Sequence, residues 1–357
     1  MTETAETEGG QHPRFCQQLF GHEPVLDQIN ITGEGRSHQS FLFSGPRGIG
    51  KASAAWMLAA RLMSGQGEAG LFGDPAAPVI NPAEKALIEA GSHPDVLSIE
   101  ADPERASKTI SIDQIRTMIP FLSHHPARGE WRVVIIDALD AVNYNGANAM
   151  LKTLEEPPQR ALIILINHET RPVLPTIRSR CRVVGFSPLD FETSRQVISR
   201  NFPDVSPDWL DVASLLADGA PGRAGLFAES NAVDLYAETC SVLASMRSPP
   251  QTIDDLARGW GAGGARNQPK RQAALLIFDR LLARAARQAA GMPQPTNEPT
   301  MDLEEQAITA IIGRINADDL ASLHQDTLRQ MVEAETLNLD AAIPLYALIN
   351  RLCGNSS

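Results

Sequence analysis

Short apolar runs alternate with amphipathic helical segments in the first half of the chain. Five runs predict buried strands: residues 41–43, 96–99, 132–137, 161–167 and 181–186. The segments between them predict helices at residues 51–63, 111–122 and 143–155. Ser111 is placed as an N-cap, and Pro157 and Pro158 end the third helix because proline cannot continue it. This alternation predicts an α/β domain with a parallel sheet, since strands that are apolar throughout suit burial on both faces.

The pattern changes after Pro188, where strand-like runs stop and helical periodicity continues towards the end of the chain. The predicted helices there are residues 191–200, 207–217, 223–230, 271–290, 303–315, 317–335 and 340–353. Stretches rich in Gly and Pro predict loops at residues 261–268 and 291–299 and a surface insertion at residues 65–82. We therefore predict four parts: a disordered tail (1–12), an α/β domain (13–187), a small helical domain (188–232) and a larger helical bundle (233–357).

Composition and charge narrow the class of protein. The formal net charge is −12, whereas a protein that binds DNA by itself usually has a basic surface. No apolar run is long enough to span a membrane, and residues 1–10 do not resemble a signal peptide, so we expect a cytoplasmic protein. The four cysteines are Cys16, Cys181, Cys240 and Cys353. They form no C-x-x-C pair, so we expect free thiols and no metal site.

The strongest motif follows the first predicted strand and opens the first predicted helix. Its sequence is Gly45-Pro46-Arg47-Gly48-Ile49-Gly50-Lys51-Ala52. This is the context of a P-loop, in which glycines let backbone N–H groups face a phosphate and the helix N-terminus adds a favourable dipole. The candidate nucleotide-binding residues are therefore Gly45, Gly48, Gly50 and Lys51, whose ammonium group would reach the outer phosphates.

Two positions of this nucleotide site lack the group that the chemistry needs. Ala52 stands where the motif normally has a Ser or Thr that binds Mg²⁺, and Ser53 is about 100° further around the helix. Asp137, at the end of the third strand, can still help to hold Mg²⁺, but the next residue, Ala138, has no carboxylate to activate water. Asp140 is a weaker candidate for that carboxylate. We therefore expect negligible ATP hydrolysis, doubtful binding of ATP and Mg²⁺, and no required cofactor.

Three further motifs resemble the bacterial clamp-loader subunits of the AAA+ family, and the delta-prime subunits above all. A helix after the third strand carries Asn148-Ala149-Met150-Leu151-Lys152-Thr153-Leu154-Glu155-Glu156-Pro157-Pro158. The family's Ser-Arg-Cys element is similar to Leu174-Pro175-Thr176-Ile177-Arg178-Ser179-Arg180-Cys181. The start of its second strand is similar to His93-Pro94-Asp95-Val96. The resemblance covers about residues 15–225, and the order of several motifs makes it specific.

The resemblance implies an AAA+ P-loop core, a helical lid at residues 188–232 and a helical collar at residues 233–357 that joins five subunits in a ring. The implied partners are ATPase motor and delta subunits, with the sliding clamp and primer–template DNA contacted through the complex, and no membrane. The chain itself would catalyse no reaction. Arg180 would act in trans on the ATP of a neighbour, because a guanidinium group offers fixed charge and forked donors to a γ-phosphate.

The sequence departs from the family's pattern in the insertion and in the lid. Residues 65–82 contain no cysteine, so the zinc module of many delta-prime sequences is not expected. Arg223 lies one residue beyond the expected sensor position at Gly222, and Asn167 falls near the polar sensor position that ends the fourth strand. Two other functions stay open. One is an active P-loop ATPase motor subunit of a clamp loader, which the missing nucleotide ligands disfavour. The other is a nucleotide-independent DNA-binding adaptor, which the acidic net charge disfavours.

Overall fold

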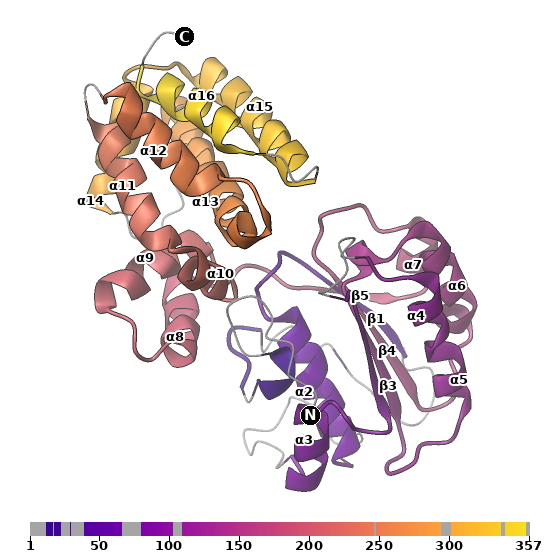
Figure 1. Cartoon of the computed structure of the whole chain (residues 1–357). Helices are drawn as coiled ribbons and strands as arrows, with labels where there is room; N and C mark the ends of the chain where they lie inside the picture. Colours follow the sequence, from indigo (N-terminus) through magenta and orange to yellow (C-terminus); the bar gives the residue numbers. More distant parts are fainter. Residues whose placement is uncertain are drawn as a thin grey trace. The chain divides into compact units, whose positions relative to one another are not determined.

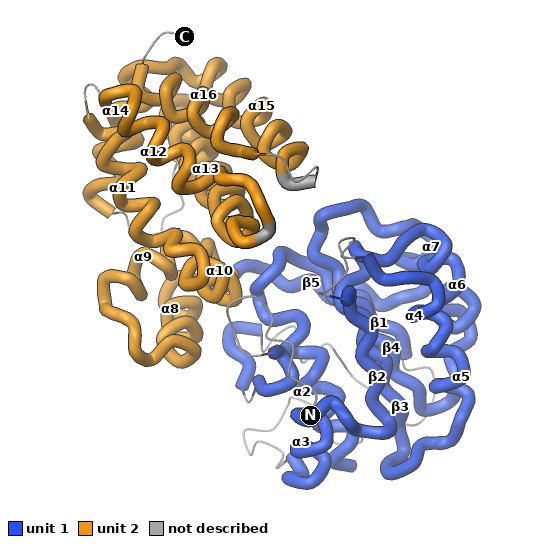
Figure 2. Tube along the Cα trace, viewed as in Figure 1, with its two compact units in different colours: residues 1–7, 11–189 blue, residues 8–10, 190–357 orange. Residues whose placement is uncertain are grey.

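The computed structural model describes residues 12–16, 18–22, 29, 39–65, 80–102, 109–245, 248–293, 301–336 and 340–354. The chain forms two compact units and passes from the first to the second between Leu189 and Asp190 (Figure 2). The predicted tail, up to residue 11, and residues 66–79 of the predicted insertion lie outside the described residues. The second unit contains both the predicted small domain and the predicted bundle, and their division at residue 232 stays a prediction.

The first unit is built on a parallel sheet. Its five strands lie in the order β2-β3-β4-β1-β5, and every neighbouring pair is parallel. The strands are β1 (Ser40–Ser44), β2 (Val96–Glu100), β3 (Arg132–Asp137), β4 (Ala161–Asn167) and β5 (Arg182–Gly185). Strand β4 lies in the middle and all its residues are buried, as expected of a strand that is apolar along nearly its whole length. The five predicted strands are therefore confirmed, and β3 and β4 have the predicted bounds.

Helices cover both faces of this sheet. The helical segments are η1 (Pro13–Phe15), α2 (Lys51–Met63), α3 (Pro82–Glu89), α4 (Ile112–Arg116), α5 (Met118–Ser123), η2 (Leu139–Ala141), α6 (Tyr144–Glu155) and α7 (Pro175–Arg178). Helices α4, α5, α6 and α7 share one core with alternate strand residues such as Leu42, Val134 and Ile163. Helices α2 and α3 lie on the other side of the sheet (Figure 1). The first unit thus has the layered arrangement that its sequence pattern predicts.

The segment predicted as one helix at residues 111–122 is two helices with a turn at Thr117. Pro120 accounts for the break, because it has no N–H to donate to the carbonyl of Arg116 and its ring crowds that carbonyl. Ser111 is the N-cap as predicted, and it belongs to a capping box. The prediction was therefore correct about where the helical segment begins and wrong about its continuity.

Helix α3 is an element that the sequence pattern does not predict, and it is held by a buried polar network. Its Glu84 receives an N–H from Arg128 at 3.0 Å, and Nε2 of His93 lies 2.8 Å from the other carboxylate oxygen. Nδ1 of His93 accepts the backbone N–H of Asp95 at 3.1 Å, so Nε2 carries the proton that faces the glutamate. The fully buried Asp95 in turn accepts the backbone N–H of Arg128 at 2.8 Å. The His-Pro-Asp motif therefore anchors the start of β2 to α3.

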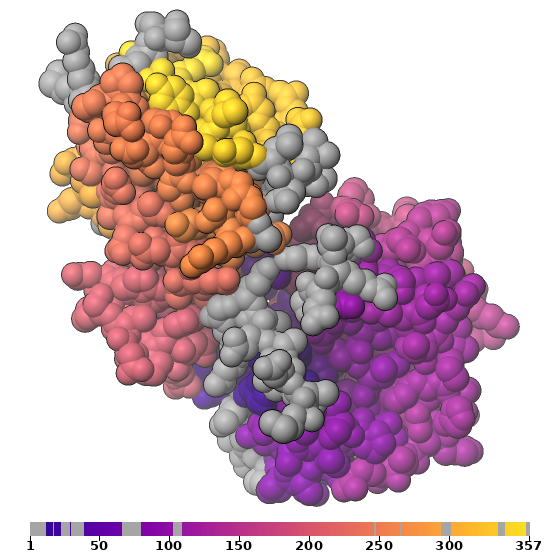
Figure 3. Space-filling view, in the orientation of Figure 1, coloured from indigo at the N-terminus to yellow at the C-terminus, as the bar shows by residue number. Residues whose placement is uncertain are grey.

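The second unit consists of helices alone among its described residues. They are α8 (Phe191–Asn201), α9 (Pro207–Ala217), α10 (Arg223–Ser230), α11 (Ala232–Ala244), α12 (Pro250–Gly261), η3 (Ala265–Asn267), α13 (Gln268–Ala289), α14 (Asp302–Ile312), α15 (Ala317–Thr336) and α16 (Ala342–Leu352). Helices α12 and α16 are far apart in sequence and lie side by side (Figures 1 and 3). Gly261 permits this approach, because a Cβ atom there would lie 2.4 Å from the backbone N of Ala342. A parallel α/β core followed by an all-helical region confirms the predicted fold class.

The described helices and side chains also bear on membrane crossing, metal binding and thiol chemistry. No helix within the described ranges is long and apolar enough to cross a membrane. The same ranges contain no group of three or more His, Cys, Asp and Glu side chains that could hold a metal ion. All four cysteines are free thiols. Burial raises the pKa of Cys181 and of Cys240 to about 12, so these two thiols stay protonated at neutral pH.

Candidate functional site

The P-loop lies at the carboxyl edge of the sheet, between β1 and α2. Its three glycines have positive φ angles, 150° at Gly45, 89° at Gly48 and 101° at Gly50, which side chains rarely allow. A Cβ atom at Gly45 would lie 2.3 Å from the carbonyl oxygen of Phe186. The glycines are therefore required by the turn that leads from the strand into the helix.

Lys51 is the first residue of α2, and its ammonium group points back into the loop. Its Nζ donates to the carbonyl oxygens of Gly45, at 2.6 Å, and Pro46, at 2.5 Å, and the residue is 2% exposed. Burial lowers the pKa of Lys51 to about 8, although nearby carboxylates oppose this change. His22 also holds the loop, because its Nε2 lies 2.7 Å from the carbonyl oxygen of Ile49. The loop's own carbonyl groups thus engage the ammonium that a bound phosphate would need.

Carboxylates that end or follow β3 and β4 act electrostatically on this lysine. Asp137, Asp140 and Glu169 each oppose the lowering of the Lys51 pKa. Asp140 is already engaged, because its Oδ2 accepts the backbone N–H of His168 at 2.7 Å. Oδ1 of Asp137 lies 3.4 Å from Nε2 of the same histidine. In this arrangement Asp140 holds the backbone at the end of β4.

Other polar side chains beside the loop are also bonded to the chain itself. The Ser53 side chain acts on the thiol of Cys16 and lowers its pKa, in opposition to the larger effect of burial, so Ser53 lies towards the N-terminal segment. Asn167 is 3% exposed, and its Nδ2 donates to Oγ of Ser44 at 3.0 Å. Ser44 then donates to a carboxylate oxygen of Glu169 at 3.0 Å. The sensor-like Asn167 therefore ties the end of β4 to the end of β1.

Arg180 lies between α7 and β5. Its guanidinium group donates to the carbonyl oxygen of Thr176 at 3.0 Å, and it forms an ion pair with Glu155, with Nη2 and Oε1 3.3 Å apart. The arginine side chain is 30% exposed. These contacts fix the direction of the guanidinium group and leave part of it open to solvent. The Glu155 partner comes from the helix whose sequence resembles the clamp-loader subunits.

The topology of the sheet separates Arg180 from the chain's own P-loop. Strand β5 runs parallel to β1, with Phe41 beside Arg182 and Ser44 beside Gly185. The P-loop follows the carboxyl end of β1, whereas Arg180 precedes the amino end of β5. The four residues of β5 between these edges span about 13 Å at 3.3 Å per residue. The structure thus leaves Arg180 at the opposite edge of the sheet. At the P-loop it brings together the other predicted site residues: Gly45, Gly48, Gly50, Lys51 and Asp137.

The geometry adds three residues to the site that motif spacing does not assign to it: His22, Glu155 and Glu169. Glu155 belongs to a helical motif, but the charged positions of that motif are equally typical of a solvent-exposed helix face, so the motif does not assign it to the site. His22 and Glu169 have no signal in the sequence, because their contacts depend on how distant segments fold together.

Comparisons with known proteins give the same relationship as the motifs. Residues 23–190 match the family model described as DNA polymerase III, delta subunit. The chain is 35% identical over 193 residues to DNA polymerase III subunit delta' of Pseudomonas aeruginosa, covering 54% of this chain and 56% of the relative. It is also 35% identical over 213 residues to subunit tau of Escherichia coli, covering 58% of this chain and 31% of the relative. The solved structure of a gamma subunit-related protein from Thermotoga maritima is 20% identical, with a TM-score of 0.44, and the match covers 93% of this chain and 99% of that chain.

The chain spans about half the length of the delta' relative and about a third of the tau relative. The residues that match the family model lie almost entirely in the first unit, which ends at Leu189. They contain the P-loop, the motif of Glu155 and the Ser-Arg-Cys element of Arg180. Residues 23–190 therefore carry the similarity of this chain to the DNA polymerase III delta-prime subunit family.

Proposed function

We propose that the chain is a subunit of the DNA polymerase III clamp loader and helps to load the sliding clamp onto primed DNA. In this role it joins ATPase motor and delta subunits in a ring, with residues 233–357 as its collar. It reaches the clamp and primer–template DNA through the complex. It hydrolyses no ATP by itself and supplies Arg180 in trans to the ATP of a neighbouring subunit.

The state of the P-loop supports the absence of turnover. Ala52 and Ala138 remove a Mg²⁺ ligand and the carboxylate that activates water. Lys51 is buried and bonded to two loop carbonyls, so an incoming phosphate has to displace both of these hydrogen bonds. Each of these features acts against binding or cleavage of MgATP at this loop.

The observation that carries the proposal is the place of Arg180 in the sheet topology. An arginine that stabilises phosphoryl transfer has to contact the oxygens of the transferred phosphate. Arg180 lies at the edge opposite its own P-loop, about 13 Å along the strand direction. Arg180 is held by Glu155 and is partly exposed, so its guanidinium group is oriented before any partner docks. A nucleotide bound by another chain is the target that fits this position.

The test is a complex reconstituted from the full-length chain with ATPase motor and delta subunits. Arg180→Ala should leave assembly normal and lower both DNA-stimulated ATP hydrolysis and the rate of clamp loading. An arginine supplied across an interface contributes about 10³ or more in related phosphoryl transfers, and the effect here should be smaller because other sites in the ring keep their own arginines. Arg180→Lys should recover little, because a point charge cannot replace the planar fork.

Arg178→Ala is the matched control, since Arg178 is an exposed arginine at the end of α7 and should contribute less. Clamp loading at the unmodified rate by Arg180→Ala rings would refute the role in trans. Steady-state ATP hydrolysis by the chain alone measures the other half of the proposal. Robust turnover that Lys51→Ala abolishes would favour an active motor subunit instead.

A further inference from the structure

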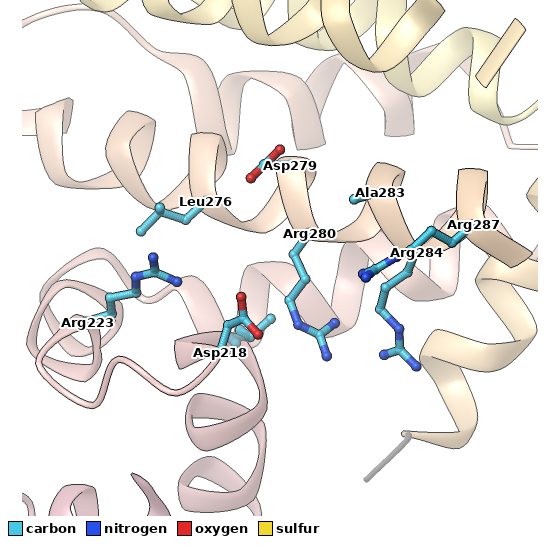
Figure 4. Close-up of a pocket in the computed structure, with 9 residues that line it drawn as sticks. Asp218, Arg223, Leu276, Asp279, Arg280, Ala283, Arg284 and Arg287 are labelled. Carbon is cyan, nitrogen blue, oxygen red and sulfur yellow. The ribbon is translucent and has the colours of Figure 1, made fainter. Parts of the chain in front are cut away.

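The second unit contains a cavity of about 140 Å³ beside helix α13. It lies outside the residues that match the family model. Its charged lining comes from α13, from the start of α10 and from the residue after α9: Asp218, Arg223, Asp279, Arg280, Arg284 and Arg287 (Figure 4). The three arginines of α13 that line the cavity follow one another at intervals of four and three residues, so they share one stripe of the helix. Figure 4 shows Arg280 and Arg284 extending from the same side of α13.

Two of these arginines share one carboxylate. Nη1 of Arg280 lies 2.6 Å from Oε1 of Glu304, and Nη1 of Arg284 lies 2.6 Å from Oε2 of the same residue. Glu304, on α14, is 0% exposed, and both arginines are buried. Two buried guanidinium groups are thus fixed by the same buried carboxylate, so their positions beside the cavity are well defined.

The other carboxylates of the lining are Asp218 and Asp279. Burial lowers the pKa of Arg223, and the weaker influence of Asp218 and Asp279 opposes this change. Oδ1 of Asp279 also lies 2.6 Å from Nε2 of His324, so this carboxylate is shared with a second group. Among the described residues, the lining and Glu304 together contain four arginines and three carboxylates.

Arg287 adds an unsatisfied donor. Its Nε is buried and has no hydrogen-bond partner among the described residues. A buried charged donor is costly unless a water or a ligand accepts its proton. The cavity has room for either, because one water needs only about 10–15 Å³ of such space. A tetrahedral oxyanion suits the lining better than a neutral molecule, because guanidinium forks match phosphate oxygens in geometry and charge.

We propose that this cavity binds a compact phosphate group, with Arg223 and Arg287 as its principal donors. The group is either inorganic phosphate or the terminal phosphate of a nucleotide, which share the same charge and oxygen geometry. The site is separate from the P-loop and does not depend on the function proposed above.

Calorimetric titration of the full-length chain with inorganic phosphate tests the proposal, at low ionic strength matched with chloride. We expect saturable binding and a higher midpoint of thermal unfolding, because a ligand of the native state stabilises it. Arg287→Gln and Arg223→Gln should each weaken binding about tenfold or more, since each removes a charged hydrogen-bond donor. Arg351→Gln changes an exposed arginine on α16 of the same unit and should leave the affinity unchanged.

ATP without Mg²⁺, titrated into the Lys51→Ala variant, distinguishes the two sources without a contribution from the P-loop lysine. Tighter binding of ATP than of inorganic phosphate supports a nucleotide ligand, and equal or weaker binding supports the free anion. Far-UV circular dichroism checks that each variant is folded. Arg287→Lys, which keeps the charge and the aliphatic stem but not the fork, provides a milder variant that should also bind more weakly. No saturable binding at millimolar phosphate, or unchanged affinity in the folded variants, overturns the proposal.

Discussion

Replacing Lys51 with methionine should remove a pH-dependent penalty on the folding of the first unit. The lysine is 2% exposed, and burial lowers its pKa from 10.5 to about 8. Between these two values the unfolded chain binds more protons at this lysine than the folded chain does. The free energy of unfolding should therefore rise as the pH rises from about 8 to 10.5, and the penalty should be fully present below about pH 8.

The size of the effect follows from the two pKa values. The difference between 10.5 and about 8 corresponds to about 3 kcal/mol. About 2 kcal/mol of this should be recovered between about pH 7 and pH 10, because the folded lysine loses its proton over this range while most unfolded chains keep theirs. The thioether side chain of methionine has no titrating group, so the Lys51→Met variant should lack this gain.

Urea unfolding at several pH values between about 7 and 10 measures the difference, with the fluorescence of Trp56, buried in α2, as a probe. Subtracting the variant from the wild type removes the titration of all other groups. Lys85→Met is the matched control, because Lys85 is a partly exposed lysine on α3 whose ion pair with Glu89 is 3.6 Å long. A wild-type minus Lys51→Met difference that stays constant across this pH range would refute the assignment of a desolvated Lys51.

Gly261→Ala should lower the free energy of unfolding of the second unit by about 2 kcal/mol, because its Cβ meets the backbone of α16 at 2.4 Å. Gly259→Ala meets only a leucine side chain at 3.2 Å and should change the same urea curve little. Glu304→Gln should cost about 3 kcal/mol, since two buried arginines lose their charged partner, and a loss below about 1 kcal/mol in thermal unfolding would contradict this account. Glu155→Gln should lower the DNA-stimulated ATPase of the reconstituted complex less than Arg180→Ala does, with normal assembly, and an unchanged rate would show that this ion pair does not position the arginine.

The strands and most helices follow from local patterns, because burial on both faces and helical periodicity leave direct traces in the sequence. The bounds of α2, β3 and β4 agree with the prediction to the residue. The periodicity of apolar residues does not predict the break at Thr117. This signal is averaged over a window of residues, and it is insensitive to the single N–H that Pro120 lacks. Helix α3 escapes it as well, because its eight residues are too few for a clear period.

The site residues divide in the same way. The P-loop and the Ser-Arg-Cys element are each a continuous stretch of sequence, so their residues can be named before the fold is known. The pairing of Arg180 with Glu155 joins positions 25 residues apart, and the direction of the Lys51 side chain depends on its rotamer. The arginine-lined cavity depends on Glu304, which reaches α13 from another helix. Such contacts are set by tertiary packing and leave no periodic signal.

The glycines of the P-loop show why the motif alone is weak evidence for nucleotide binding. Gly45 has to lack a side chain because of the carbonyl of Phe186, and Gly50, the N-cap of α2, has a left-handed conformation. Both requirements come from the turn between β1 and α2, and they hold whether or not a phosphate is bound. Positions 52 and 138 carry more information, since only the chemistry of MgATP asks for a hydroxyl and a carboxylate there, and both are alanine. A loop explained by packing, together with Arg180 at the opposite edge of the sheet, is consistent with the proposed subunit, which hydrolyses no ATP itself and supplies an arginine to a neighbour's ATP.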